Sequence, residues 1–84
     1  MQKNTVTVIF NIEKKGQTFD IEVPLSISAN ELVVALDSAF ELGIDVSDIK
    51  NCYLQAENPI ALLKGEKTLA DYGIRNGSRI FFRK

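Results

Sequence analysis

The sequence predicts an α+β fold, in which a mixed five-stranded sheet has one main helix packed on one face. Three observations support this: two alternating segments joined by a glycine-containing turn, an amphipathic helical segment after them, and shorter alternating segments in the second half. The 84 residues are enough for one small domain, residues 1–84, with a single modest core. A composition of 45% hydrophobic and 25% charged residues is ordinary for a globular protein.

A β-hairpin is predicted at the start of the chain. Apolar and polar residues alternate in "TVTVIFNI" (residues 5–12) and again in "TFDIEVPL" (residues 18–25). The faces expected to be buried are Val6, Val8, Phe10 and Ile12 in the first strand, and Phe19, Ile21, Val23 and Leu25 in the second. Between the strands, "EKKGQ" is a polar turn in which Gly16 is free to adopt a positive φ.

The main helix is predicted over about residues 29–42. Ser28 and Glu31 have the spacing of a capping box, in which each side chain accepts a hydrogen bond from the backbone N–H of the other residue. Gly43 is expected to end the helix in a left-handed conformation. The apolar stripe is predicted as Ala29, Leu32, Leu36, Ala39 and Phe40, with Val33 on its flank.

Shorter elements are predicted in the second half. A connecting loop with apolar anchors at Ile44, Val46 and Ile49 leads into a third strand, where Cys52, Leu54 and Ala56 alternate with Asn51, Tyr53 and Gln55. A short fourth strand is expected in "IALLK", ended by Gly65. In the last strand Ile80 and Phe82 point one way, and Arg79, Phe81 and Arg83 point the other. The predicted core contains Val6, Val8, Phe10, Phe19, Ile21, Val23, Leu32, Leu36, Phe40, Leu69, Ile80 and Phe82.

The segment "TLADYGI" (residues 68–74) is predicted to form a capped turn before the last strand. Thr68 and Asp71 have the spacing of a second capping box, and Leu69, Tyr72 and Ile74 supply apolar contacts. Asn76-Gly77 then predicts a tight turn that delivers the last strand in register.

Residues that perform enzyme chemistry are scarce. The chain has no histidine, the commonest general base and metal ligand. Cys52 has no neighbouring His or Cys with which to form a dyad, so we interpret it as a small core residue. Asp45 and Asp48 are too sparse for a calcium loop. We therefore expect no catalytic site, no metal and no cofactor.

Nucleic acid and membrane partners are not expected either. Arg79, Phe81 and Arg83 alternate basic with aromatic side chains, as a stacking platform would, but a pI of 5.3 opposes nucleic-acid binding. A shift of DNA or RNA mobility at low salt would contradict this expectation. No apolar stretch approaches the ~20 residues needed to span a bilayer. The N-terminal residues lack the apolar block of a signal peptide, so we expect a cytoplasmic protein.

The predicted element order is that of the β-grasp fold, and "TLADYGIRNGSRIFF" (residues 68–82) resembles the corresponding stretch of ubiquitin. The block "KGEKTLADYGIRNGSRI" is similar to the YukD/EsaB family, small ubiquitin-like proteins of Gram-positive type VII secretion systems. Its family-like positions are Gly65-Glu66, Leu69, Asp71, Gly73-Ile74, Asn76-Gly77 and Arg79. The resemblance implies a non-catalytic accessory or regulatory factor for the export of small helical WXG-motif proteins, with partners in the secretion machinery.

A ubiquitin-like modifier or sulphur carrier is the alternative function. Such proteins expose a C-terminal Gly-Gly whose carboxylate enters an activating enzyme. This sequence ends in "FFRK", without a terminal glycine, so we expect no conjugation to targets.

A partner-binding surface is predicted on the face of the sheet that the helix leaves uncovered. In a β-grasp sheet the first strand lies beside the last, and the last beside the third. The candidate residues are Ile9, Tyr53 and Phe81, flanked by Arg79 and Arg83. Aromatic and arginine side chains grouped in this way are typical of an interaction hot spot, for a partner protein or for a homodimer. Val34, opposite the buried stripe of the helix, is a weaker second candidate.

Overall fold

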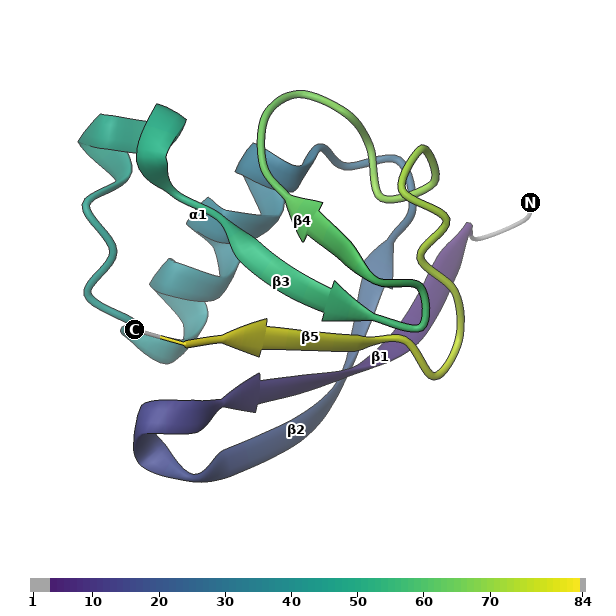
Figure 1. Ribbon diagram of the computed structural model, residues 1–84, viewed down its shortest axis with the longest axis horizontal. Helices are drawn as coiled ribbons and strands as arrows, with labels where there is room; N and C mark the ends of the chain where they lie inside the picture. Colours follow the sequence, from purple (N-terminus) through teal and green to yellow (C-terminus); the bar gives the residue numbers. More distant parts are fainter. Residues whose placement is uncertain (1–3, 84) are drawn as a thin grey trace.

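The computed structural model describes residues 4–83. Within them lie five strands, one α-helix and two short 3-10 helices. Their bounds are β1 Thr5–Ile12, η1 Glu13–Lys15, β2 Gln17–Pro24, α1 Ala29–Phe40, η2 Val46–Asn51, β3 Leu54–Glu57, β4 Ala61–Leu63 and β5 Arg79–Phe82. The predicted α+β architecture is confirmed (Figure 1).

The strands form one mixed sheet in the order β2-β1-β5-β3-β4. β1 and β5 are parallel, and the other neighbouring pairs are antiparallel. The first strand therefore lies beside the last and the last beside the third, as predicted. In Figure 1 the strands lie in front of α1, which covers one face of the sheet. We call this the covered face, and the opposite one the open face.

The hydrophobic core lies between the covered face and α1. Most of the predicted core residues are buried, but Phe19, Ile21 and Phe40 are only partly buried and pack against the edge of the core. Phe19 and Ile21 belong to β2, which has a neighbouring strand on one side only, so their side chains stay partly open. The core also contains Ile12, Ala29, Val33, Leu42, Cys52, Leu54, Ala56, Leu63 and Ile74.

Helix α1 begins as predicted but ends earlier. Both hydrogen bonds of the Ser28–Glu31 capping box are present, at 3.0 and 3.1 Å. The helix stops at Phe40, and the left-handed residue that ends it is Glu41 (φ 53°) rather than Gly43. The earlier end lets the chain turn back, so that Leu42 is buried in the core.

The buried stripe of α1 also differs from the prediction. Val33 is fully buried and Ala39 is exposed, which reverses their predicted order. Val33 and Ala39 flank the stripe through Ala29, Leu32 and Leu36 on opposite sides, and the packing of α1 on the sheet buries the side with Val33. The prediction of Ala39 as a stripe residue was therefore wrong.

The segment predicted as a connecting loop forms η2, whose N-cap Asp45 accepts a hydrogen bond from the Ser47 backbone N–H. Ile49 in η2, and Ile44 before it, pack against the core as predicted. Val46 is exposed, so its predicted role as an anchor was wrong.

The capped turn before β5 is confirmed. Thr68 and Asp71 exchange both hydrogen bonds of the predicted box, each at 3.1 Å, and Leu69 is fully buried. An isolated antiparallel bridge pairs Thr68 with Ser28, so the two capping boxes lie next to each other. The turn is thereby attached to the start of α1.

The Asn76-Gly77 turn fixes the register of β5 against β1. The Ser78 N–H donates to the Arg75 carbonyl at 3.0 Å, which closes the turn, and Gly77 has a φ of 88°. The Asn76 side-chain oxygen accepts from the Thr7 N–H at 2.8 Å, and the Gly77 N–H donates to the Thr7 carbonyl at 2.9 Å. The turn is therefore hydrogen-bonded to β1 where the parallel pairing begins.

Candidate functional site on the open face of the sheet

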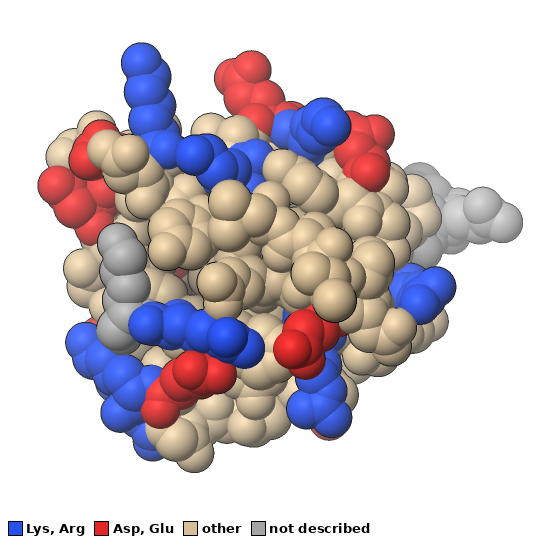
Figure 2. Space-filling model, viewed as in Figure 1, with Lys and Arg blue, Asp and Glu red and all other residues tan. Residues whose placement is uncertain are grey.

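The open face has an uncharged centre with charged side chains around it. Figure 2 views this face and shows a largely uncharged central area, with most of the Lys, Arg, Asp and Glu side chains at its margin. The central strand β5 contributes Phe81, which is half-buried, while its neighbours Ile80 and Phe82 point into the core. The predicted alternation of β5 is therefore confirmed.

Three of the predicted site residues come together at one end of this face. In the β3–β5 ladder Gln55 is opposite Phe81, and the same register continued by two residues puts Tyr53 opposite Arg83. Tyr53 lies just before β3, and Arg83 just after β5. A small hollow is lined by Tyr53, Gln55, Phe81, Phe82 and Arg83.

Arg83 is held over the aromatic ring of Phe81. Its guanidinium carbon lies 4.6 Å from the ring centroid, and its Nε lies 3.2 Å from the Glu13 carboxylate. Both side chains of this ion pair are almost half exposed, so the pair contributes little to stability, about 0–1 kcal/mol. Its effect is to orient a planar cation beside an aromatic surface.

The other two predicted residues lie further along the same face. Ile9 is opposite Arg79 in the β1–β5 pairing, and Arg79 is opposite Glu57 on its other side. Ile9 is diagonal to Phe81 across these strands, within the reach of long side chains. All five predicted residues thus share the open face, and their role in binding stays a prediction.

Two apolar residues of this face were missed. Leu62 in β4 is 48% exposed, and Ile60 in the turn before it is 90% exposed. Leu62 is opposite Gln55, which continues the row from Phe81 to the edge of the sheet. The alternation of Ala61, Leu62 and Leu63 is a weak signal for this, because three residues do not reveal which side faces the core.

These two residues border a shallow depression of about 370 Å³. The residues that line it are Gln55, Ala56, Glu57, Ile60, Ala61, Leu62, Phe81 and Arg83. The depression widens the candidate surface beyond the predicted residues, toward β4. Its lining presents aliphatic, aromatic and guanidinium groups on a shallow surface that a partner can contact.

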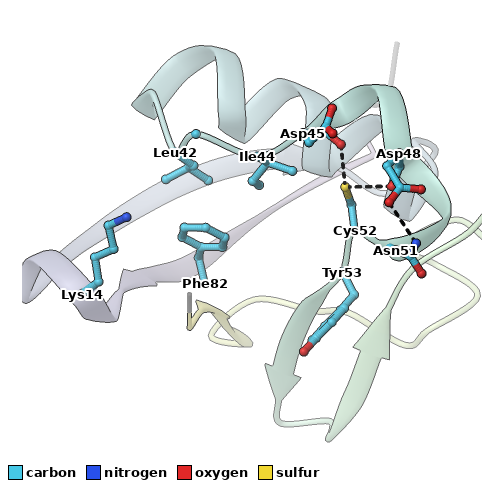
Figure 3. A pocket seen from close by; sticks show the side chains of 10 residues that line it. Lys14, Leu42, Ile44, Asp45, Asp48, Asn51, Cys52, Tyr53 and Phe82 are labelled. Carbon is cyan, nitrogen blue, oxygen red and sulfur yellow. Dashed lines mark hydrogen bonds between the residues drawn. The ribbon is translucent and has the colours of Figure 1, made fainter.

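Another hollow, of about 300 Å³, lies where β5 ends (Figure 3). Its apolar lining includes Leu42, Ile44 and Phe82. The Cys52 thiol donates to the backbone carbonyls of Asp45 at 3.3 Å and of Asp48 at 3.4 Å. Cys52 is buried with the core, which confirms its predicted placement.

Within residues 4–83, no group of three or more His, Cys, Asp or Glu could hold a metal ion. In the same part of the chain, no helix has both the length and the apolar character needed to cross a membrane.

Solved structures with a similar fold include several ubiquitin-like domains. A ubiquitin-like domain from tubulin-binding cofactor B matches with a TM-score of 0.73 and 21% identity, covering 95% of this chain and 89% of that chain. The C-terminal ubiquitin-like domain of mouse tubulin-specific chaperone e has a TM-score of 0.70, with 15% identity and coverage of 96% and 87%. The UBL domain of yeast Ddi1 has a TM-score of 0.68, with 15% identity and coverage of 99% and 92%. This likeness confirms the predicted ubiquitin-like β-grasp fold.

No curated protein has a significant match to the sequence. A family model does match it, over residues 5–81, and its description is "WXG100 protein secretion system (Wss), protein YukD". The match spans nearly all of the described strands and helices, including the capped turn and the Asn76-Gly77 turn. The chain therefore belongs to the YukD family of ubiquitin-like proteins.

Proposed function

We propose that this protein is a non-catalytic interaction module and a cytoplasmic accessory or regulatory component of a Gram-positive type VII (WXG-protein) secretion system. It acts by binding a protein partner reversibly through its open face, without becoming conjugated to a target. The family match over residues 5–81 supports the link to WXG100 protein secretion.

The observation that supports the binding role best is the cluster of Tyr53, Phe81 and Arg83 on the open face. Interfaces are enriched in aromatic residues and arginine, and their hot spots combine such residues with a desolvated centre. Here the guanidinium already stacks on the ring, so little side-chain entropy is lost when a partner covers both. The neighbouring aliphatic side chains of Ile60 and Leu62 extend the apolar area.

A component of the secretion machinery is the proposed partner, and a second copy of the chain is the alternative occupant of the same surface. Sedimentation of the purified protein distinguishes the two. A monomer at all concentrations supports the hetero-partner, whereas a dimer that Phe81→Ser dissociates supports the second copy.

The secretion role is tested by deletion and complementation in the source bacterium. We expect deletion to abolish export of the WXG-motif proteins or to change their cellular level. The wild-type gene and Val46→Ser should restore the phenotype, whereas Phe81→Ser should not. Val46 is the matched control because it is also apolar and 39% exposed, but lies in η2, outside the sheet. A deletion that leaves both export and effector levels intact contradicts the proposal.

Conjugation is tested separately, by mass spectrometry of the protein recovered from cells and after incubation with lysate and ATP. We expect the unmodified mass and no ladder of larger species. A C-terminal isopeptide or thiocarboxylate would show instead that the protein is a modifier or a sulphur carrier.

A further inference from the structure

Among the described strands, β2 has a neighbour on one side only, which leaves a long outer edge. β2 and β4 are the two edge strands of the sheet (Figure 1). β4 has three residues, whereas β2 has eight and pairs with β1 one-to-one along its whole length, without a bulge. Edge strands in proteins are commonly protected by shortness, bulges, proline or charged side chains. In β2 the features of this kind are Pro24, its last residue, and the two acidic residues Asp20 and Glu22.

The hydrogen-bonding pattern identifies which backbone groups of β2 point outward. The Leu25 N–H donates to the Asn4 carbonyl at 2.8 Å, so this is a hydrogen-bonded pair of the hairpin. Such pairs alternate along an antiparallel ladder, so Val23, Ile21 and Phe19 also bond to β1. The N–H groups of the residues between them, Thr18, Asp20 and Glu22, therefore point away from β1, along the edge. The backbone N–H and carbonyl groups of these three residues therefore have the spacing of one side of a β-ladder.

The side chains beside this edge differ on its two sides. Toward α1, Phe19 and Ile21 are only partly buried, and the Phe19 ring packs on Phe40 with its centroid 4.9 Å away. Toward the open face, Asp20 and Glu22 are exposed and are the charged residues of β2, which has no Lys or Arg. A strand added here would meet half-covered apolar groups on one side and carboxylates on the other.

We propose that β2 binds an extended segment of a partner protein, which adds to the sheet as a sixth strand. Alternate residues of the segment are basic and face Asp20 and Glu22, because opposite charges stabilise cross-strand pairs. The residues between them are apolar and complete the cover over Phe19 and Ile21. Backbone hydrogen bonds give such a complex its affinity, and the alternate side chains give it specificity. This site is separate from the open-face cluster and goes beyond the function proposed above.

A second copy of the chain fits this edge poorly. Antiparallel pairing of two β2 strands about a two-fold axis centred between Asp20 and Glu22 brings these carboxylates opposite, or diagonal to, those of the copy. Like charges placed directly opposite each other are destabilising. The acidic edge therefore favours a basic segment from a different protein.

The test uses amide hydrogen exchange of the full chain, followed by NMR. The probe is a short capped peptide in which Lys alternates with Val. We expect the amides of Thr18, Asp20 and Glu22 to exchange about tenfold more slowly when the peptide is at about ten times its Kd, because only the free protein exchanges. The amides of Phe19 and Ile21, already bonded to β1, should change much less.

Three controls make the result specific. A peptide with Glu in place of Lys should not protect these amides, and the double variant Asp20→Lys, Glu22→Lys should reverse the preference between the two peptides. Phe81→Ser should leave the protection intact, so failure of the open-face function and failure of this edge are distinguishable. The inference is overturned if millimolar Lys–Val peptide leaves the three amides unchanged, or if their protection appears without peptide and grows with protein concentration, which would mean self-pairing.

Discussion

The two faces of the sheet are built from the same strands but differ in burial. On the covered face, the side chains of β1, β3 and β5 that point toward α1 are all buried. On the open face, the side chains of these strands range from half-buried to exposed, and they include arginine, carboxylate and amide groups. Neighbouring residues in a strand therefore belong to different environments, one responsible for stability and the other available for binding.

Phe81 and Phe82 show the difference within a single strand. They are adjacent and chemically identical, yet Phe82 is 5% exposed and packs in the core, whereas Phe81 is half-buried beneath Arg83.

The first prediction compares the two phenylalanines. Phe82→Ala should lower the free energy of unfolding by about 3–5 kcal/mol, because it opens a cavity in a small core. Phe81→Ala removes a half-covered side chain and should cost about 1 kcal/mol, within the range of strand-position effects. Urea denaturation of both variants measures the difference. Equal losses would mean that the two faces contribute alike to stability.

The second prediction extends the comparison to α1. Leu36→Ala should cost about 2–5 kcal/mol, since Leu36 is buried between the helix and the sheet. Val34→Ala, on the exposed side of the same helix, should stay within about 0.5 kcal/mol of the wild type. Thermal denaturation provides the readout. A loss below about 1 kcal/mol for Leu36→Ala would contradict the assigned packing of the helix.

The third prediction concerns the turn that carries the chain into β5. Thr68→Ala removes the acceptor for the Asp71 N–H and should cost about 0.5–2 kcal/mol. Thr68→Ser keeps the hydroxyl and should retain most of the stability. If the serine variant loses as much as the alanine variant, the methyl group rather than the hydrogen bond stabilises the turn. The two variants are compared by urea denaturation.

The fourth prediction concerns a polar group of the open face. Among the described residues, the buried Asn11 Nδ2 has no hydrogen-bond partner, although Oδ1 accepts from the Thr18 hydroxyl. Asn11→Thr removes this N–H and introduces a residue that favours strands. We expect a change between zero and about 1 kcal/mol in the stabilising direction. A clear destabilisation would mean that the amide has a favourable environment, such as the neighbouring ring of Phe81.

Elements with local signals could be predicted from the sequence alone. Alternation over eight residues was sufficient to assign β1 and its buried face. Two capping boxes and the Asn76-Gly77 turn were identified from spacings of one to three residues, and their hydrogen bonds are present in the structure. The strand order was expected only from the resemblance to β-grasp proteins. Given that order, the alternation within each strand predicted the common face of the five candidate residues.

The degree of burial of each side chain, and the extent of the surfaces, depend on tertiary packing and could not be predicted from local patterns. The end of α1 at Phe40, the full burial of Val33, the exposure of Val46 and the outward position of Leu62 all differ from the predictions or were absent from them. The partial burial of Phe19 and Ile21 also depends on the tertiary structure, because β2 lies at the edge of the sheet. Burial depends on which element packs opposite a residue, and that element is usually distant in the sequence. A local pattern therefore predicts the direction of a side chain, whereas the assembled sheet and helix decide what, if anything, covers it.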